Sequence, residues 1–157
     1  MEHNFQIEAI NYSEVKYLFQ LSDEELSKVN AVRMVVDQKP GYPCRVSLQD
    51  AEIGEEVILF PYMHHDVKSP YKSSGPVFVR KNAETAQLRI NEIPVMLNHR
   101  LLSIRAYDKD SMIVKAEVIE GNIIADAIEY FLSNSKIEYI HVHNAKPGCY
   151  NCRIMRV

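Results

Sequence analysis

LLSIRAYDKDSMIVKAEVIEGNIIADAIEYFLSNSKIEYIHVH, residues 101–143, contains four predicted elements in succession. Apolar and polar residues alternate around Ile104 and again around Val114, with the polar residues 108–111 between the two runs. Alternation with a period of two is typical of half-buried strands, and a short polar connection joins antiparallel neighbours. This part of the sequence therefore predicts a β-hairpin.

A helix and a strand are predicted directly after the hairpin. The apolar residues of the helix form one stripe, because they recur at helical spacing: Ile123, Ile124, Ala127, Ile128, Phe131 and Leu132. Residues 137–143 then alternate as a strand, with Ile140 and Val142 on one face. His141 and His143 share the other face, about 6.6–6.8 Å apart along the chain.

The flanking sequence adds mostly strands. Residues 5–10 alternate, Ser22 and Glu25 form a capping box that begins a short helix, and further strands are predicted at 31–36, 57–60, 76–80 and 152–157. Five of the seven prolines fall within residues 40–76, which argues against a helix there. We expect an α+β fold with a mostly antiparallel sheet, open or barrel-like, and two helices packed outside it.

Composition excludes several classes of protein. The chain has 157 residues and a net charge of −3, so we expect one domain over residues 1–157 and no nucleic-acid partner, which would need a basic face. No apolar run approaches the roughly 20 residues of a membrane span, and no secretion leader is evident. Three cysteines, an odd number, favour reduced thiols and a cytoplasmic location. No cofactor is predicted from a sequence motif.

The main functional hypothesis is a polar pocket for a small anionic ligand, in an enzyme or a binding protein. Histidines follow the predicted strand 57–60, and arginines lie in or beside strands, where converging guanidinium groups would bind a carboxylate or a phosphate. The candidate residues are His64, His65, Arg80, Arg45, His143 and Cys149. The hypothesis requires residues 64–80 to lie beside residues 141–153.

Two alternatives remain open. His141, His143, Cys149 and Cys152 are all residue types that bind zinc, and they would meet at the predicted C-terminal hairpin. Alternatively, the nine tyrosines and an exposed sheet edge would serve a non-enzymatic protein-interaction module. The oligomeric state does not follow from the sequence.

Several stretches together resemble a known family. They include PGYPCRVSL (residues 40–48), Pro61-Tyr62 with His64-His65, SGPVFVR (74–80), HVHNA (141–145) and GCY (148–150). In these motifs the chain resembles an uncharacterised bacterial family catalogued as a domain of unknown function, DUF1203. The resemblance implies a single small soluble domain with no assigned reaction, so it transfers no catalytic role to any residue.

Overall fold

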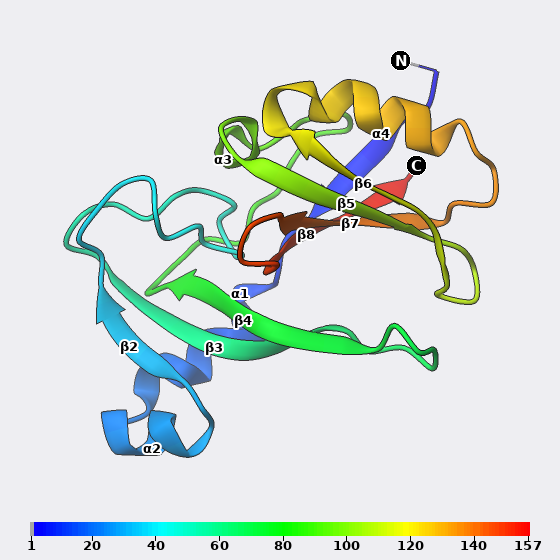
Figure 1. Cartoon of the computed structure of the whole chain (residues 1–157). Coiled ribbons are helices and arrows are strands. Elements are labelled where there is room, and N and C mark those ends of the chain that lie inside the picture. Colours follow the sequence, from blue (N-terminus) through cyan, green and yellow to red (C-terminus); the bar gives the residue numbers. More distant parts are fainter. Residues whose placement is uncertain (1) are drawn as a thin grey trace.

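The computed structural model describes residues 2–157, which build two antiparallel sheets. The larger sheet has the strand order β1-β8-β7-β5-β6 and the smaller has the order β2-β3-β4 (Figure 1). The strands are β1 (Phe5–Glu8), β2 (Val32–Val35), β3 (Glu56–His65), β4 (Ser73–Arg80), β5 (Leu101–Tyr107), β6 (Ile113–Glu120), β7 (Tyr139–Asn144) and β8 (Tyr150–Arg156). The α+β fold and the predicted hairpin of β5 and β6 are therefore confirmed.

Helices pack against each sheet. They are α1 (Tyr12–Val15), α2 (Asp23–Lys28), α3 (Val95–Asn98) and α4 (Ile124–Leu132), with 3₁₀ turns at Lys16–Gln20 and Gly121–Ile123. The sequence predicts α2 and α4 only, because α1 and α3 have four residues each and are too short to show a helical period. The sheets also remain separate and do not close into a barrel. Within residues 2–157, no helix is long and apolar enough to cross a membrane.

The outer face of the larger sheet forms an apolar core with α4 (Figure 1). Ile124, Ile128 and Phe131 of α4 are buried there, as the apolar stripe predicts. The strands supply Leu102, Ile104, Ile140, Val142, Cys152 and Ile154. Because side chains alternate along a strand, the neighbours of these residues point the other way, toward the smaller sheet.

Strand β3 is longer than predicted and carries both of its histidines inside the strand. His64 and His65 are its last two residues, whereas the sequence places them in a loop after residue 60. The strand continues through Pro61, which lies opposite Pro76 of β4. Strand β2 pairs only with residues 56–59 of β3, so the side of β3 that faces β2 is unpaired beyond residue 59. Pro61 fits there because an unpaired strand edge tolerates a residue without an N–H group.

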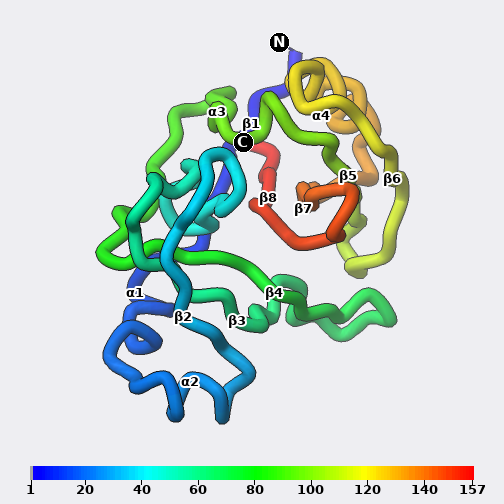
Figure 2. Tube along the Cα trace, turned by 60° about the vertical axis from the view of Figure 1, so that its left-hand side comes forward, coloured from blue at the N-terminus to red at the C-terminus, as the bar shows by residue number. Residues whose placement is uncertain are grey.

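The two sheets meet where β3 and β4 run beneath the hairpin of β7 and β8 (Figure 2). Tyr150 of β8 is buried in a second apolar cluster with Ile58, Phe60 and Val77 of the smaller sheet. The region that joins β2 to β3 also connects the sheets, because the backbone N–H of Ile10 donates to the Arg45 carbonyl and that of Arg45 to the Phe78 carbonyl, both over 3.0 Å. Two distant stretches of sequence are thereby brought together.

Gly121, the first residue of the 3₁₀ turn before α4, provides a test of how closely that turn packs against α3. A Cβ atom at Gly121 would lie 1.8 Å from the Leu97 carbonyl oxygen, whereas one at Gly75 would meet nothing within 4 Å. We expect Gly121→Ala to lower the free energy of unfolding by about 3 kcal/mol or more through overpacking, and Gly75→Ala to change it by less than about 0.5 kcal/mol. Urea denaturation measures both variants, and equal stabilities would contradict this packing.

Candidate functional site

Three histidines from the two sheets converge between β3 and β7. The ring centroid of His64 lies 6.1 Å from that of His141 and 5.1 Å from that of His143. Each ring offers a nitrogen atom such that the three atoms lie within 4.8 Å of one another. We call His64, His141 and His143 the histidine centre. His141 and His143 are buried, and His64 is partly exposed.

Strand alternation and two bulges aim these side chains. Ile58, Phe60, Tyr62 and His64 follow one another at a spacing of two along β3, and the first two are buried toward the interior. The register of β3 against β4 shifts between Tyr62 and His65, so that His65 also turns inward and is 3% exposed. Bulges often re-aim side chains in this way near functional sites.

The second bulge lies between β7 and β8. Cys152 pairs with Val142 but Tyr150 pairs with His143, which leaves Asn151 as the extra residue. Tyr150 therefore shares the inner side with the histidines. Its ring stacks on His64, with centroids 5.1 Å apart and planes inclined by 6°.

Each of the three rings has a buried nitrogen atom that makes no hydrogen bond. His64 Nδ1, His141 Nδ1 and His143 Nε2 are buried without a hydrogen-bond partner. His143 Nδ1 lies 2.9 Å from the Gly148 carbonyl oxygen. A carbonyl only accepts, so Nδ1 carries the hydrogen and Nε2 of the neutral ring presents a lone pair.

Burial keeps the centre neutral. Desolvation, with smaller contributions from the neighbouring histidines and Arg153, lowers the pKa of His141 to about 2. The same cause lowers the pKa of His143 to about 3 and that of His64 to about 4. All three rings are therefore uncharged at neutral pH, which is the form that binds a metal or accepts a hydrogen bond.

Three arginines surround the histidine centre. In cross-strand register His141 has Arg105 of β5 on one side and Arg153 of β8 on the other, and directly opposed residues have Cβ atoms about 4.5–5.5 Å apart. Arg45, which precedes β3, acts electrostatically on His143. We call Arg45, Arg105 and Arg153 the arginine set.

The arginine set has no carboxylate partner in the described part of the chain, whereas Arg33, Arg80, Arg89 and Arg100 each have one. Arg45 is 1% exposed, and it donates from Nε to the Tyr150 carbonyl and from Nη1 to the Pro43 carbonyl. Burial lowers its pKa to about 10. Arg105 donates to the Ser103 hydroxyl. The Arg153 guanidinium lies 4.3 Å from the centroid of a tyrosine ring, and its buried Nε has no partner.

His65 lies beside the histidine centre but has a different environment. Its Nδ1 donates to the Tyr71 carbonyl over 2.7 Å, and its Nε2 lies 2.6 Å from the Tyr139 hydroxyl, which also bonds the Ser111 hydroxyl. Both ring nitrogens are thus engaged. His65 holds the end of β3 against β7 and positions its neighbour His64.

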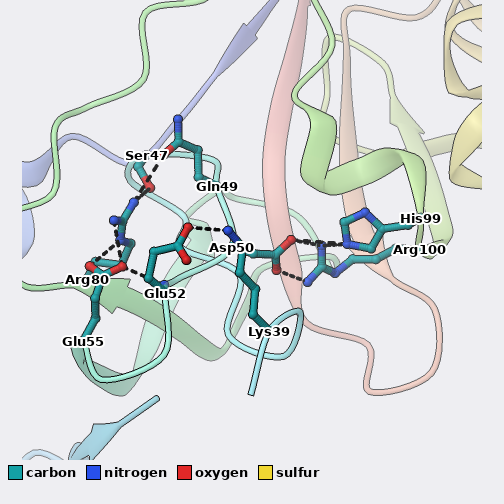
Figure 3. A network of polar contacts seen from close by, with 9 residues as sticks. All are labelled: Lys39, Ser47, Gln49, Asp50, Glu52, Glu55, Arg80, His99 and Arg100. Carbon is teal, nitrogen blue, oxygen red and sulfur yellow. Dashed lines mark hydrogen bonds and ion pairs between the residues drawn. The ribbon is translucent and has the colours of Figure 1, made fainter. Parts of the chain in front are cut away.

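Arg80 does not reach the histidine centre. Arg80 is the last residue of β4, whereas the histidines of β3 lie beside the first residues of β4, around Ser74. Arg80 and Ser74 are six residues apart, which is about 20 Å along an extended strand. There Arg80 forms a bidentate pair with Glu55, at 2.9 and 2.8 Å, and also contacts Ser47 and Gln49 (Figure 3). It lines a separate cavity of about 1110 Å³.

The cysteines also separate. Cys149 follows Gly148, whose carbonyl His143 contacts, and it acts electrostatically on Arg45. Cys152 is fully buried in the apolar core beneath α4, on the face of the larger sheet that points away from His141. Strand alternation is the reason, because Cys152 pairs with Val142 and lies two residues from Ile154, so it faces the same core as both.

The structure therefore brings together His64, His143, Arg45 and Cys149 of the predicted pocket, with His65 alongside and Arg80 elsewhere. The pocket predicted from the sequence omits Arg105, Arg153 and Tyr150. It also omits His141, which the sequence suggests only as a ligand in the alternative zinc site. The sequence does indicate the orientation of Arg105, because alternation puts it on the polar face of the strand 101–107. Its place opposite His141 depends on pairing that the sequence does not show.

Comparison with known proteins identifies a family. A family model described as "Protein of unknown function (DUF1203)" matches residues 41–156. The chain belongs to the DUF1203 family. The match confirms the resemblance found in the sequence motifs, and its range includes the whole histidine centre and arginine set. No curated protein and no solved structure is significantly similar to the chain.

The buried histidines of this DUF1203 protein predict acid sensitivity. Below the unfolded-state pKa of about 6.5, the unfolded chain binds protons that His141 and His143, with pKa values lowered to about 2 and 3, do not bind when folded. The free energy of unfolding therefore falls as the pH drops from about 6.5, by up to about 1.4 kcal/mol per pH unit for each histidine.

Urea denaturation in EDTA between about pH 5 and 7 measures this dependence. The same series on His141→Gln is the control, and its slope should be smaller by about one proton. Equal slopes for the two proteins would show that His141 does not resist protonation.

Proposed function

We propose that this protein binds a small oxyanion, a phosphate or a carboxylate, at the histidine centre. One observation carries the proposal: the arginines that lack a carboxylate partner gather around the three histidines. Arg156 also lacks a carboxylate, but it donates to three carbonyl groups at the end of α4 and in the connection that follows. The other unpaired guanidinium groups are Arg45, Arg105 and Arg153.

Electrostatics supports an anion rather than a cation or a neutral ligand. The chain has a net charge of −3, and no carboxylate is among the groups that act on the pKa of the three histidines. Arg45 is buried and Arg105 and Arg153 are half-buried, and Glu8, which lies opposite Arg153 in register, is exposed and forms no ion pair with it. Cationic side chains that are held together in this way repel one another and lose hydration. An oxyanion between them would remove both costs and accept the hydrogen bonds that Arg153 Nε and the arginine forks offer.

Position limits the size of the ligand. His141 and His143 are 2% and 1% exposed, so only His64, Arg105 and Arg153 present the centre to solvent. This favours a small ion or the terminal group of a larger molecule. The cavity beside Arg80 is a weaker candidate, because the Glu55 carboxylate already accepts two hydrogen bonds from that guanidinium.

Titration of the purified chain with inorganic phosphate, and separately with oxalate, tests the proposal. We expect saturable binding by calorimetry and stabilisation of about 2.7 kcal/mol at a ligand concentration of 100 Kd. Arg105→Gln and Arg153→Gln should each weaken binding about ten- to a hundredfold, the value of a charge-assisted hydrogen bond.

Arg89→Gln is the matched control, since it removes the same charge from a side chain that is 88% exposed, and it should bind like the parent protein. Arg80→Gln should also leave affinity unchanged. An effect of Arg80→Gln as large as that of Arg105→Gln would move the site to the cavity beside Arg80 and refute the proposal.

A further inference from the structure

We propose that His64, His141 and His143 hold one divalent transition-metal ion of the zinc class, with a coordination position left open for the oxyanion. The metal site rests on the geometry of the three rings. The identity of the open-position ligand rests in addition on the proposed function.

The ligand atoms are close to the required arrangement. Three nitrogens bound to one zinc at about 2.0–2.1 Å in tetrahedral geometry lie about 3.4 Å apart. The three ring nitrogens here lie within 4.8 Å of one another, so small side-chain rotations would bring them onto a common ion. Two ligands come from alternate positions of β7 and the third from the facing strand β3, which fixes their relative placement.

The unpartnered nitrogens are the second observation. A buried polar atom without a partner costs about 1–3 kcal/mol, and such atoms usually mark an unseen water, ion or catalytic role. Here three occur in one cluster, one on each of His64, His141 and His143. A metal ion would use lone pairs that nothing else in this part of the chain accepts.

The surroundings also orient the ligands. The bond from His143 Nδ1 to the Gly148 carbonyl leaves Nε2 as the nitrogen with the lone pair, which is the usual way in which a protein prepares a metal-binding histidine. Stacking on Tyr150 holds the plane of His64. His65 is not a ligand because both of its nitrogens are engaged.

The number of ligands indicates an open position. Within residues 2–157, no cysteine or carboxylate belongs to this group. Structural zinc sites have four protein ligands, whereas sites that bind exogenous molecules have three. Neutral imidazoles with no carboxylate favour zinc, cobalt, nickel or copper over magnesium or calcium.

The arginine set makes metal and anion binding mutually dependent. Arg105 and Arg153 disfavour a bare cation beside His141, and an oxyanion on the metal would offset their charge. By linkage, phosphate should then raise the affinity for the metal by the same factor as the metal raises the affinity for phosphate. A second group, Glu2, His3 and Glu129, is a weaker candidate because Glu129 already accepts backbone hydrogen bonds.

The test uses the untagged full chain, stripped with EDTA and titrated with Co²⁺ and Zn²⁺. We expect one ion per chain by elemental analysis and a visible Co²⁺ absorption spectrum typical of tetrahedral coordination. His64→Phe keeps an aromatic ring against Tyr150 but removes the ligand, and it should lower affinity at least about a hundredfold, as should His143→Phe. His3→Ala, in the second group, should bind normally.

Fewer than about 0.2 ions per chain after saturation and desalting, or unchanged binding by folded His64→Phe, would overturn the metal site. Circular dichroism and thermal melting establish that each variant is folded. If His143→Phe unfolds, His64→Phe, which changes the partly exposed ligand, decides the result.

The same titration separates this inference from the proposed function. If phosphate binds the EDTA-treated chain and added Co²⁺ or Zn²⁺ does not bind, the metal site is overturned and oxyanion binding is supported. The opposite result is one bound Co²⁺ whose spectrum and affinity do not change when phosphate is added, both in the parent protein and in Arg105→Gln. That result would support the metal site and overturn the oxyanion as its ligand.

Discussion

The two faces of strand β7 have opposite chemical requirements, and the rest of the structure depends on this division. Ile140 and Val142 point into the apolar core beneath α4, while His141 and His143 point into the space between the sheets. A shift of one residue would bury both imidazoles under the helix and expose the apolar pair. The core beneath α4 therefore fixes the register that presents the histidines.

The space between the sheets is unusual in its balance of charge. The histidines are neutral because they are buried, and the arginines around them have no carboxylate partner. Elsewhere Arg80 and Arg100 are each paired with an acidic residue, Glu55 and Asp50, as Figure 3 shows. The same chain thus pairs its arginines with carboxylates in one region and leaves them unpaired in another, which is the basis for assigning an anion to the second.

Structural and functional histidines can be distinguished by their hydrogen bonds. His64 and His65 are adjacent, and both turn toward the larger sheet because of the bulge in β3. His65 has a partner for each nitrogen and joins the sheets, whereas His64 retains a buried nitrogen with none. Two identical side chains therefore differ in bonding capacity, and His64, which retains an unused nitrogen, is the candidate ligand of the two.

The sequence by itself determined the fold class, the hairpin of β5 and β6, the helix α4 and the alternation that puts His141 with His143, because these follow from short-range periodicity. The tertiary structure alone decided that His64 meets them, that Arg80 lies elsewhere, and that Arg105 and Arg153 flank His141. Pairing between strands and contact between sheets join residues that are far apart in the chain, such as Phe5 with Arg156 and His64 with His143, which no local pattern encodes. Bulges explain further differences: one inserted residue reverses the alternation, so Tyr150 and His65 both face inward.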